Sequence, residues 1–274
     1  SIDFAIFDEA HRTARITQSK NKKNIPSFSF ALDDKNLLIK KRLFMTATRR
    51  ISSRNKFNKE GDSKLSLTMD NEKIYGKVCE NLTFNQAAKQ NIIAKLKIIV
   101  SFVTSDEVNR EKRGISSTII QGKEITTEQI ANQIAIKNAV KKYKINKIFS
   151  FHNSVSRAKS FTSINNEGIK NHLTGFYTNH IEGGMRTKIR EINMEDFKRN
   201  SNGILSNARC LIEGVDVPSV NMVAFIDSKQ SQIDIVQATG RALRNRNQPN
   251  KKFGYVLLPI FVEKKKKEKL STAL

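Results

Sequence analysis

The chain has 274 residues, with 49 Lys and Arg against 26 Asp and Glu, and its formal net charge is +23. This excess favours a polyanionic partner such as nucleic acid, although part of it reflects a composition rich in Lys, Asn and Ile throughout. The two cysteines, Cys79 and Cys210, exclude a metal knuckle and more than one disulfide, which favours reduced thiols in a cytoplasmic protein. No apolar run reaches the roughly 18 residues of a membrane helix, so no membrane partner is expected.

The chain opens on an apolar run, residues 2–7, which is interrupted only by Asp3 and predicts a buried parallel strand. Asp8, Glu9 and His11 follow it. Two carboxylates at the carboxyl end of a buried strand lie where open α/β sheets place ligands. In a phosphoryl-transfer site, Asp8 would hold Mg²⁺ and Glu9 would orient and deprotonate the attacking water. The alternative is that Asp8 only caps the helix that follows.

The next predicted elements lead toward a second domain. Residues 43–48 (LFMTAT) predict a short strand that ends in two threonines. Thr83 and Gln86 form a capping box, so we expect a short helix there, followed by a strand over residues 96–103. We place the boundary between the two domains near residue 90.

Thr126 with Gln129 starts a further predicted helix, which is expected to end near Lys144. Residues 145–151 then predict a strand. Ser154 has the residue type and position of an N-cap for the helix after that strand.

Shorter elements follow. Residues 203–206 and residues 222–227 predict two strands, and the second ends in a carboxylate. Residues 254–262 predict a closing strand, in which Pro259 favours an edge position or a bulge. Residues 263–274 are rich in lysine and are expected to form a solvated basic tail.

A late helix is predicted from the capping box of Ser231 and Asp234 to about residue 244. Its apolar stripe, which we expect to pack on a sheet, consists of Ile233, Val236, Gly240 and Leu243. A second stripe of Gln237, Arg241 and Arg244 places a carboxamide and two guanidinium groups along one edge. Such an edge is suited to binding negatively charged groups. The alternative is that it is the solvated basic edge of an ordinary amphipathic helix.

Several of these segments resemble the motifs of superfamily 2 helicases and translocases. Residues 210–218 (CLIEGVDVP) carry the G-x-D-x-P of motif V, and residues 237–244 carry the Q-x-x-G-R-x-x-R of motif VI. Residues 8–11 (DEAH) resemble motif II, and the Thr-Ala-Thr at residues 46–48 resembles motif III. The residues of these motifs are most similar to those of motor domains in restriction–modification enzymes of type I and type ISP.

The resemblance implies an α/β fold with RecA-like parallel sheets. An incomplete first motor domain is expected over residues 1–90, and a complete second, helicase C-terminal domain over residues 91–262. The implied cofactors are ATP and Mg²⁺, with Asp8 as the metal ligand. The implied partners are nucleic acid, with DNA favoured over RNA, and an N-terminal helicase half or other restriction–modification subunits. The implied site residues are Asp8, Glu9, Gln237, Arg241 and Arg244 for catalysis, Gly214, Asp216 and His11 for the nucleotide, and Thr46, Thr48, Asn153, Ser154, Asn207 and Arg209 for nucleic acid.

No G-x-x-x-x-G-K-S/T sequence occurs in the 274 residues, so the loop that cradles the β- and γ-phosphates is missing from them. Truncation upstream or a split gene is the simplest explanation at this stage. We therefore expect an ATP-driven helicase or DNA translocase in the intact parent and an inactive fragment here. The alternative is a non-catalytic nucleic-acid-binding remnant. A histidine-based metalloenzyme is disfavoured because the four histidines show no i, i+4 spacing.

Overall fold

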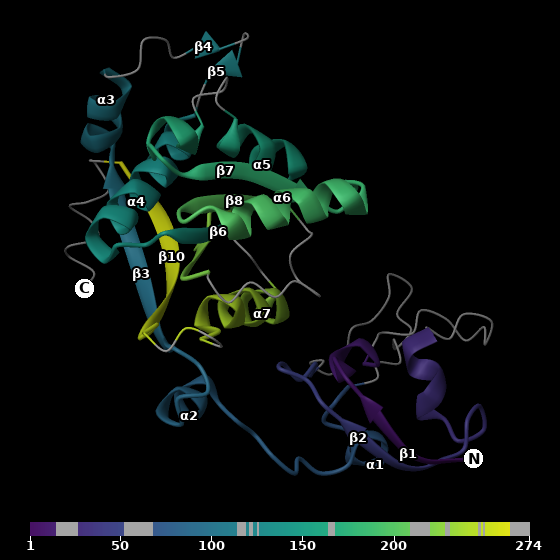
Figure 1. Ribbon diagram of the computed structural model, residues 1–274. Helices are drawn as coiled ribbons and strands as arrows, with labels where there is room; N and C mark the ends of the chain where they lie inside the picture. Colours follow the sequence, from purple (N-terminus) through teal and green to yellow (C-terminus); the bar gives the residue numbers. More distant parts are fainter. Residues whose placement is uncertain are drawn as a thin grey trace. The chain divides into compact units, whose positions relative to one another are not determined.

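The computed structural model describes residues 1–14, 27–51, 68–113, 119–120, 123–124, 126–163, 168–208, 220–227, 231–245, 248 and 250–263. They belong to two compact units, Ser1–Asn81 and Leu82–Leu274 (Figure 1). The sequence placed the boundary near residue 90, whereas these units divide after Asn81. The second unit begins earlier because α2 (Phe84–Lys89) contacts its strand β3 (Lys95–Thr104).

The first unit contains a two-stranded parallel sheet. β1 (Ile2–Phe7) pairs with β2 (Ile39–Phe44), from Ile2 opposite Ile39 to Phe7 opposite Phe44. The parallel pairing agrees with the prediction, but the expected burial of β1 is wrong, since Phe4 and Ile6 are 53% and 58% exposed. An apolar strand is buried only where other elements cover it, and the described residues of this unit leave one face of β1 open.

A small core forms beside the ends of these strands. It contains Ala10, Ala14 and Met69 with Phe7, Phe44 and Tyr75 packed against them. The Phe44 ring lies 4.9 Å from the rings of both Phe7 and Tyr75. Two 3-10 helices, η1 (Ala10–Arg12) and η3 (Ser27–Leu32), and one helical turn, α1 (Glu72–Tyr75), complete the described part of this unit. The core therefore anchors the segment that follows β1.

The second unit is built on a six-stranded sheet with the strand order β3-β10-β9-β6-β8-β7 (Figure 1). Its other strands are β6 (Lys147–Phe151), β7 (Tyr177–Glu182), β8 (Gly203–Ala208), β9 (Met222–Phe225) and β10 (Phe253–Val262). Every pairing in this sheet is parallel. The predicted α/β class with a parallel sheet is confirmed.

β10 lies inside the sheet, which corrects the edge position that Pro259 suggested. β9 pairs with β10 only over Tyr255–Leu257. Pro259 lies beyond the end of β9, so its missing N–H removes no hydrogen bond to that strand.

Helices bury both faces of the sheet. On one face, α3 (Ser105–Arg113), α4 (Thr127–Tyr143) and α5 (Val155–Thr162) share a core with Ile148 of β6. On the other face, α6 (Thr187–Arg199) and α7 (Gln232–Leu243) share a core with Phe149 of β6. Adjacent strand residues therefore serve opposite cores, as the pleat requires. The remaining short elements are β4 (Ile119–Ile120) paired with β5 (Lys123–Glu124), and η5 (Ile169–Asn171).

The capping boxes of Thr83–Gln86 before α2 and of Thr126–Gln129 before α4 are present. Within the described ranges, no helix is long and apolar enough to cross a lipid bilayer.

Candidate functional site

The acidic segment after β1 forms a turn tied to the end of β2. Asp8 is exposed, and Glu9 has a left-handed backbone (φ 49°) with its N–H donating to Asp8 Oδ1 at 2.8 Å. The N-cap of η1 is Glu9, without a side-chain cap bond, so the alternative that Asp8 caps this helix is wrong. The Ala10 N–H donates to the Met45 carbonyl at 2.9 Å, and the Met45 N–H donates to the Phe7 carbonyl at 2.9 Å.

The side chains of His11 and Thr46 also join these two segments. His11 is 7% exposed, and its Nδ1 lies 3.0 Å from Thr46 Oγ1 and 3.2 Å from Glu9 Oε2. Thr46 Oγ1 donates its only proton to the Thr48 carbonyl at 3.0 Å, so Nδ1 carries a hydrogen and donates to Thr46 and Glu9. The predicted strand over residues 43–48 is corrected: β2 ends at Phe44, and the two threonines form a turn through their own hydrogen bonds.

The carboxylates of this turn fit a magnesium ion that is held partly by a nucleotide. Mg²⁺ in such sites is bound by one or two carboxylates together with waters and phosphate oxygens. Asp8 supplies an exposed carboxylate at the end of a parallel strand, and Glu9 lies beside it. Among the residues that the structure describes, no group of three or more His, Cys, Asp or Glu side chains is placed to hold a metal ion. The donor set therefore suits Mg²⁺ bound with a nucleotide, and does not suit a metal bound by protein alone.

In the second unit, polar residues gather at the carboxyl ends of β6 and β9. The Asp227 side chain is 4% exposed, accepts a hydrogen bond from the Asn153 N–H at 2.8 Å and forms an ion pair with Arg157. Ser154 caps α5 as predicted, because its Oγ accepts from the Arg157 N–H at 3.2 Å. A cavity of about 740 Å³ extends from these residues along α7 and β10. This edge is where parallel sheets place ligands.

His152 and Asn207 lie beneath this edge. His152 is 2% exposed, its Nε2 is 3.1 Å from Ser150 Oγ, and burial lowers its pKa to about 4. Asn207 is 1% exposed. Asn153 and Ser154, which were also expected to contact nucleic acid, are exposed, so the three residues differ in the surface that they offer.

α7 begins at its predicted N-cap, where Ser231 Oγ accepts from the Asp234 N–H at 3.3 Å. Its packed face differs from the prediction. Ala238 and Ala242 are buried in the core with Ile235 beside them, whereas Leu243 is the only buried member of the predicted apolar stripe. Small residues lie on this face because α7 approaches β10 closely: a Cβ on Gly254 would be 2.3 Å from the Ala242 carbonyl oxygen.

The predicted polar stripe of α7 is divided. Gln237 is half-buried and Arg241 is only 6% exposed. Arg244 is exposed, but it follows the last helical residue and its backbone is not helical (φ −58°, ψ 127°). The expectation of one continuous edge is therefore wrong, because the helix ends before Arg244 and Arg241 lies inside the second unit.

Three predicted site residues, Gly214, Asp216 and Arg209, lie outside the described residues. Sequence reasoning also missed one buried cation, Lys147, which is 3% exposed at the start of β6 with its Nζ 4.5 Å from the centre of the Phe197 ring. A lysine beside the apolar segment Ile148–Phe151 was a signal that could have found it.

Residues 127–246 match the family described as helicase conserved C-terminal domain. No curated protein matches the chain. Among solved structures, the chain is similar to the ATP-dependent type ISP restriction–modification enzyme LlaBIII bound to DNA, with 27% identity and a TM-score of 0.71 over 95% of this chain. The chain spans 18% of the length of that enzyme.

A fragment assigned as an HsdR subunit of a type I restriction enzyme from Vibrio vulnificus YJ016 shares the fold, with 15% identity and a TM-score of 0.57. That similarity covers 95% of this chain and 47% of the fragment. The predicted resemblance to the C-terminal portion of superfamily 2 helicases, and to the helicase regions of restriction–modification enzymes in particular, is confirmed. The parallel sheet of the second unit is RecA-like, as predicted.

Proposed function

We propose that this chain, in which residues 127–246 carry a helicase conserved C-terminal domain, is part of an ATP-dependent nucleic-acid motor. More narrowly, we propose a DNA translocase or helicase of a restriction–modification system. Support comes from the similarity to LlaBIII at 27% identity and from the net charge of +23, which favours a polyanionic track.

In this proposal the chain supplies both acidic and basic groups to ATP hydrolysis. Asp8 holds Mg²⁺, which would neutralise phosphate charge, and Glu9 orients and deprotonates the attacking water. Arg241 and Arg244 stabilise charge on the transferred phosphoryl group, and Gln237 contacts the same group. Gly214 and Asp216 contact the nucleotide, while Thr48, Asn153, Ser154 and Arg209 contact nucleic acid.

One observation carries the proposal: the Nδ1–H of His11 donates at once to Thr46 Oγ1 and Glu9 Oε2. A shared hydrogen links the carboxylate assigned to the water with the threonine turn after β2. A change at either segment therefore shifts the other. Such a link suits a motor in which nucleic-acid binding must alter the rate of hydrolysis.

We expect Thr46→Val to reduce the stimulation of ATP hydrolysis by DNA about fivefold, because one hydrogen bond contributes about 1 kcal/mol. The measurement uses a chimera in which residues 1–274 replace the matching stretch of LlaBIII. Thr178→Val is the matched control, since its buried hydroxyl has no hydrogen-bond partner among the described residues. Unchanged stimulation in a stably folded Thr46→Val chimera would count against the coupling.

A further inference from the structure

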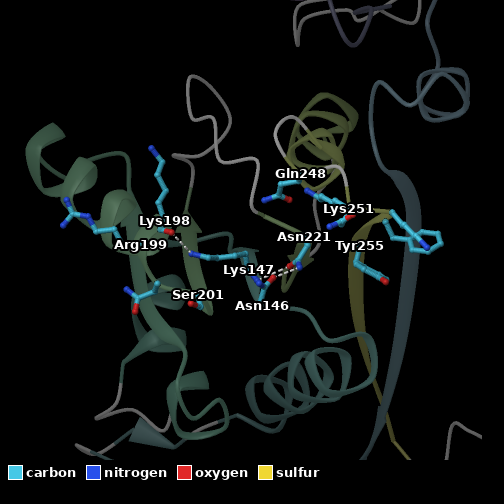
Figure 2. A pocket seen from close by; sticks show the side chains of 13 residues that line it. Asn146, Lys147, Lys198, Arg199, Ser201, Asn221, Gln248, Lys251 and Tyr255 are labelled. Atoms are coloured by element: carbon cyan, nitrogen blue, oxygen red, sulfur yellow. Dashed lines mark hydrogen bonds between the residues drawn. The ribbon is translucent and has the colours of Figure 1, made fainter.

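A second cavity lies at the opposite edge of the second unit's sheet. Its volume is about 830 Å³, and Figure 2 shows the side chains that line it. It is formed where β6, β9 and β10 begin and where α6 ends, so it opens at the amino ends of the strands. We call it the amino-edge cleft. The described residues that line it are Asn146, Lys147, Lys198, Arg199, Asn200, Ser201, Asn221, Gln248, Asn250, Lys251, Lys252, Phe253 and Tyr255.

The chemistry of this lining is one-sided. Five of its side chains are cations, six are carboxamides or a hydroxyl, two are aromatic, and none of the described lining residues is a carboxylate. Glu195 lies outside the lining, and its Oε1 accepts a hydrogen bond from Lys198 Nζ at 2.9 Å. A concave surface with one sign of charge concentrates anions. The lining therefore selects a ligand that is negatively charged and rich in hydrogen-bonding groups.

Two of the cations are fixed in place at the base of the cleft. The Lys251 ammonium donates to the carbonyl oxygens of Val220 at 2.5 Å and Arg244 at 2.6 Å. The Lys147 ammonium donates to the Phe197 carbonyl oxygen and to the Lys198 carbonyl oxygen, and Figure 2 marks the second of these bonds. Burial lowers the pKa of both groups, to about 8 for Lys251. Both groups are therefore held in position in the unliganded protein, and an anion would stabilise their charged forms.

An aromatic side chain borders the same cleft. Phe253 is 37% exposed, and the centre of its ring lies 6.2 Å from the centre of the Tyr255 ring and 5.3 Å from Lys97 Nζ. Asn221 and Asn146 are hydrogen-bonded to one another at 2.6 Å beside these rings. Basic grooves that also offer an aromatic face are typical of surfaces that bind single strands, because phosphates meet the cations while a base stacks on the ring. A duplex keeps its bases stacked inside and would leave the ring unused.

We propose that the amino-edge cleft binds a single strand of nucleic acid, with its phosphates against Arg199 and Lys252 at the rim and a base against Phe253. This site is separate from the carboxyl edge to which the proposed function assigns nucleic acid. It would give the motor a second contact with a strand, at the amino ends of the sheet strands.

The test measures the affinity of residues 1–274 for a fluorescent 12-nucleotide DNA strand over a range of salt concentrations. Because Arg199 and Lys252 are exposed, the double variant R199A/K252A is expected to fold. We expect it to bind at least tenfold more weakly, with a salt slope lower by about 1.4, since each phosphate contact on a single strand contributes about 0.7. Phe253→Ala is expected to weaken binding about fivefold with an unchanged slope. The matched control is K141A/K170A, which removes two exposed lysines outside the cleft. It should leave both the affinity for the strand and the salt slope as they are in the wild type.

Hydrogen exchange with and without the strand locates the contact. Protection of residues 198–202 and 250–253 is the expected result. Protection confined to residues 153–157 would overturn the cleft and leave the proposed function standing, whereas loss of DNA binding altogether would remove both. The cleft assignment is also overturned if tripolyphosphate or ATP binds there and the strand does not. A 12-base-pair duplex that binds more tightly than the strand would overturn it too. The same holds if R199A/K252A binds the strand as tightly as the control variant does.

Discussion

Replacing Arg244 by alanine in the LlaBIII chimera is expected to lower kcat for ATP hydrolysis about 10³-fold or more, because a guanidinium that stabilises the transferred phosphoryl group contributes about 10³ to 10⁵ in rate. Arg244 is exposed at the C-cap of α7, so the loss should occur without unfolding. The hydrogen bond from Lys251 reaches the main-chain oxygen of residue 244 and survives the substitution.

Arg241 is the less informative target. It is 6% exposed, and its replacement would disturb the packing of α7 as well as any charge that it offers to a nucleotide. The matched control for Arg244 is Arg110→Ala, which removes an exposed arginine from α3. If Arg244→Ala and Arg110→Ala chimeras hydrolyse ATP at the same rate, Arg244 has no role in phosphoryl transfer. A rise in KM for ATP with unchanged kcat would likewise indicate binding alone.

Acidification from pH 6.5 to pH 4 is expected to remove about 3 kcal/mol from the free energy of unfolding of the second unit through His152 alone. The pKa of this buried imidazole is lowered from 6.5 to about 4, chiefly by burial, while Asp227 raises it and Arg157 lowers it. Between these two values the unfolded chain binds the proton and the folded chain does not, so stability rises with pH across this window. The stability that the neutral His152 contributes is fully present above pH 6.5 and is lost as the pH falls toward 4.

Hydrogen exchange of amides in β6 and β8 measures this stability specifically, since the two units need not unfold together. His152→Gln removes the titrating group. Between pH 6.5 and pH 4, the free energy of unfolding of this variant should therefore fall about 3 kcal/mol less than that of the wild type. Other groups, including Glu111, whose pKa the hydrogen bond from Lys137 lowers, act equally in both proteins and cancel in the difference. Parallel profiles for the two proteins would mean that His152 titrates normally in the folded state.

Local signals in the sequence predicted local structure well. The capping boxes at Thr83 and Thr126 and the N-caps at Ser154 and Ser231 all appear, because a cap depends on residues three positions apart. The charged sequence of α3 carries the same kind of signal, which was not recognised: Thr104 and Glu107 form a capping box, in which the Glu107 N–H donates to Thr104 Oγ1 at 3.4 Å and the Thr104 N–H donates to Glu107 Oε2 at 2.8 Å.

Features that depend on distant residues were not predictable in this way. The buried face of α7 is decided by its close approach to Gly254, and the exposure of Phe4 by the elements that pack on β1. The amino-edge cleft joins Lys147, Arg199 and Lys252, which only the strand order brings together. The motifs predicted the resemblance to helicases, whereas the tertiary packing decided which of their residues are exposed.

The most direct test of the central claim compares ATP hydrolysis, at saturating DNA, by residues 1–274 alone and by the LlaBIII chimera. The chain alone should show almost no activity, because its sequence contains no G-x-x-x-x-G-K-S/T loop. The chimera should hydrolyse ATP, and Glu9→Gln should return it to the level of the isolated chain. Robust DNA-stimulated hydrolysis by residues 1–274 alone, or a folded chimera that binds DNA but never hydrolyses ATP, would contradict the account, and the second result would favour a non-catalytic nucleic-acid-binding remnant.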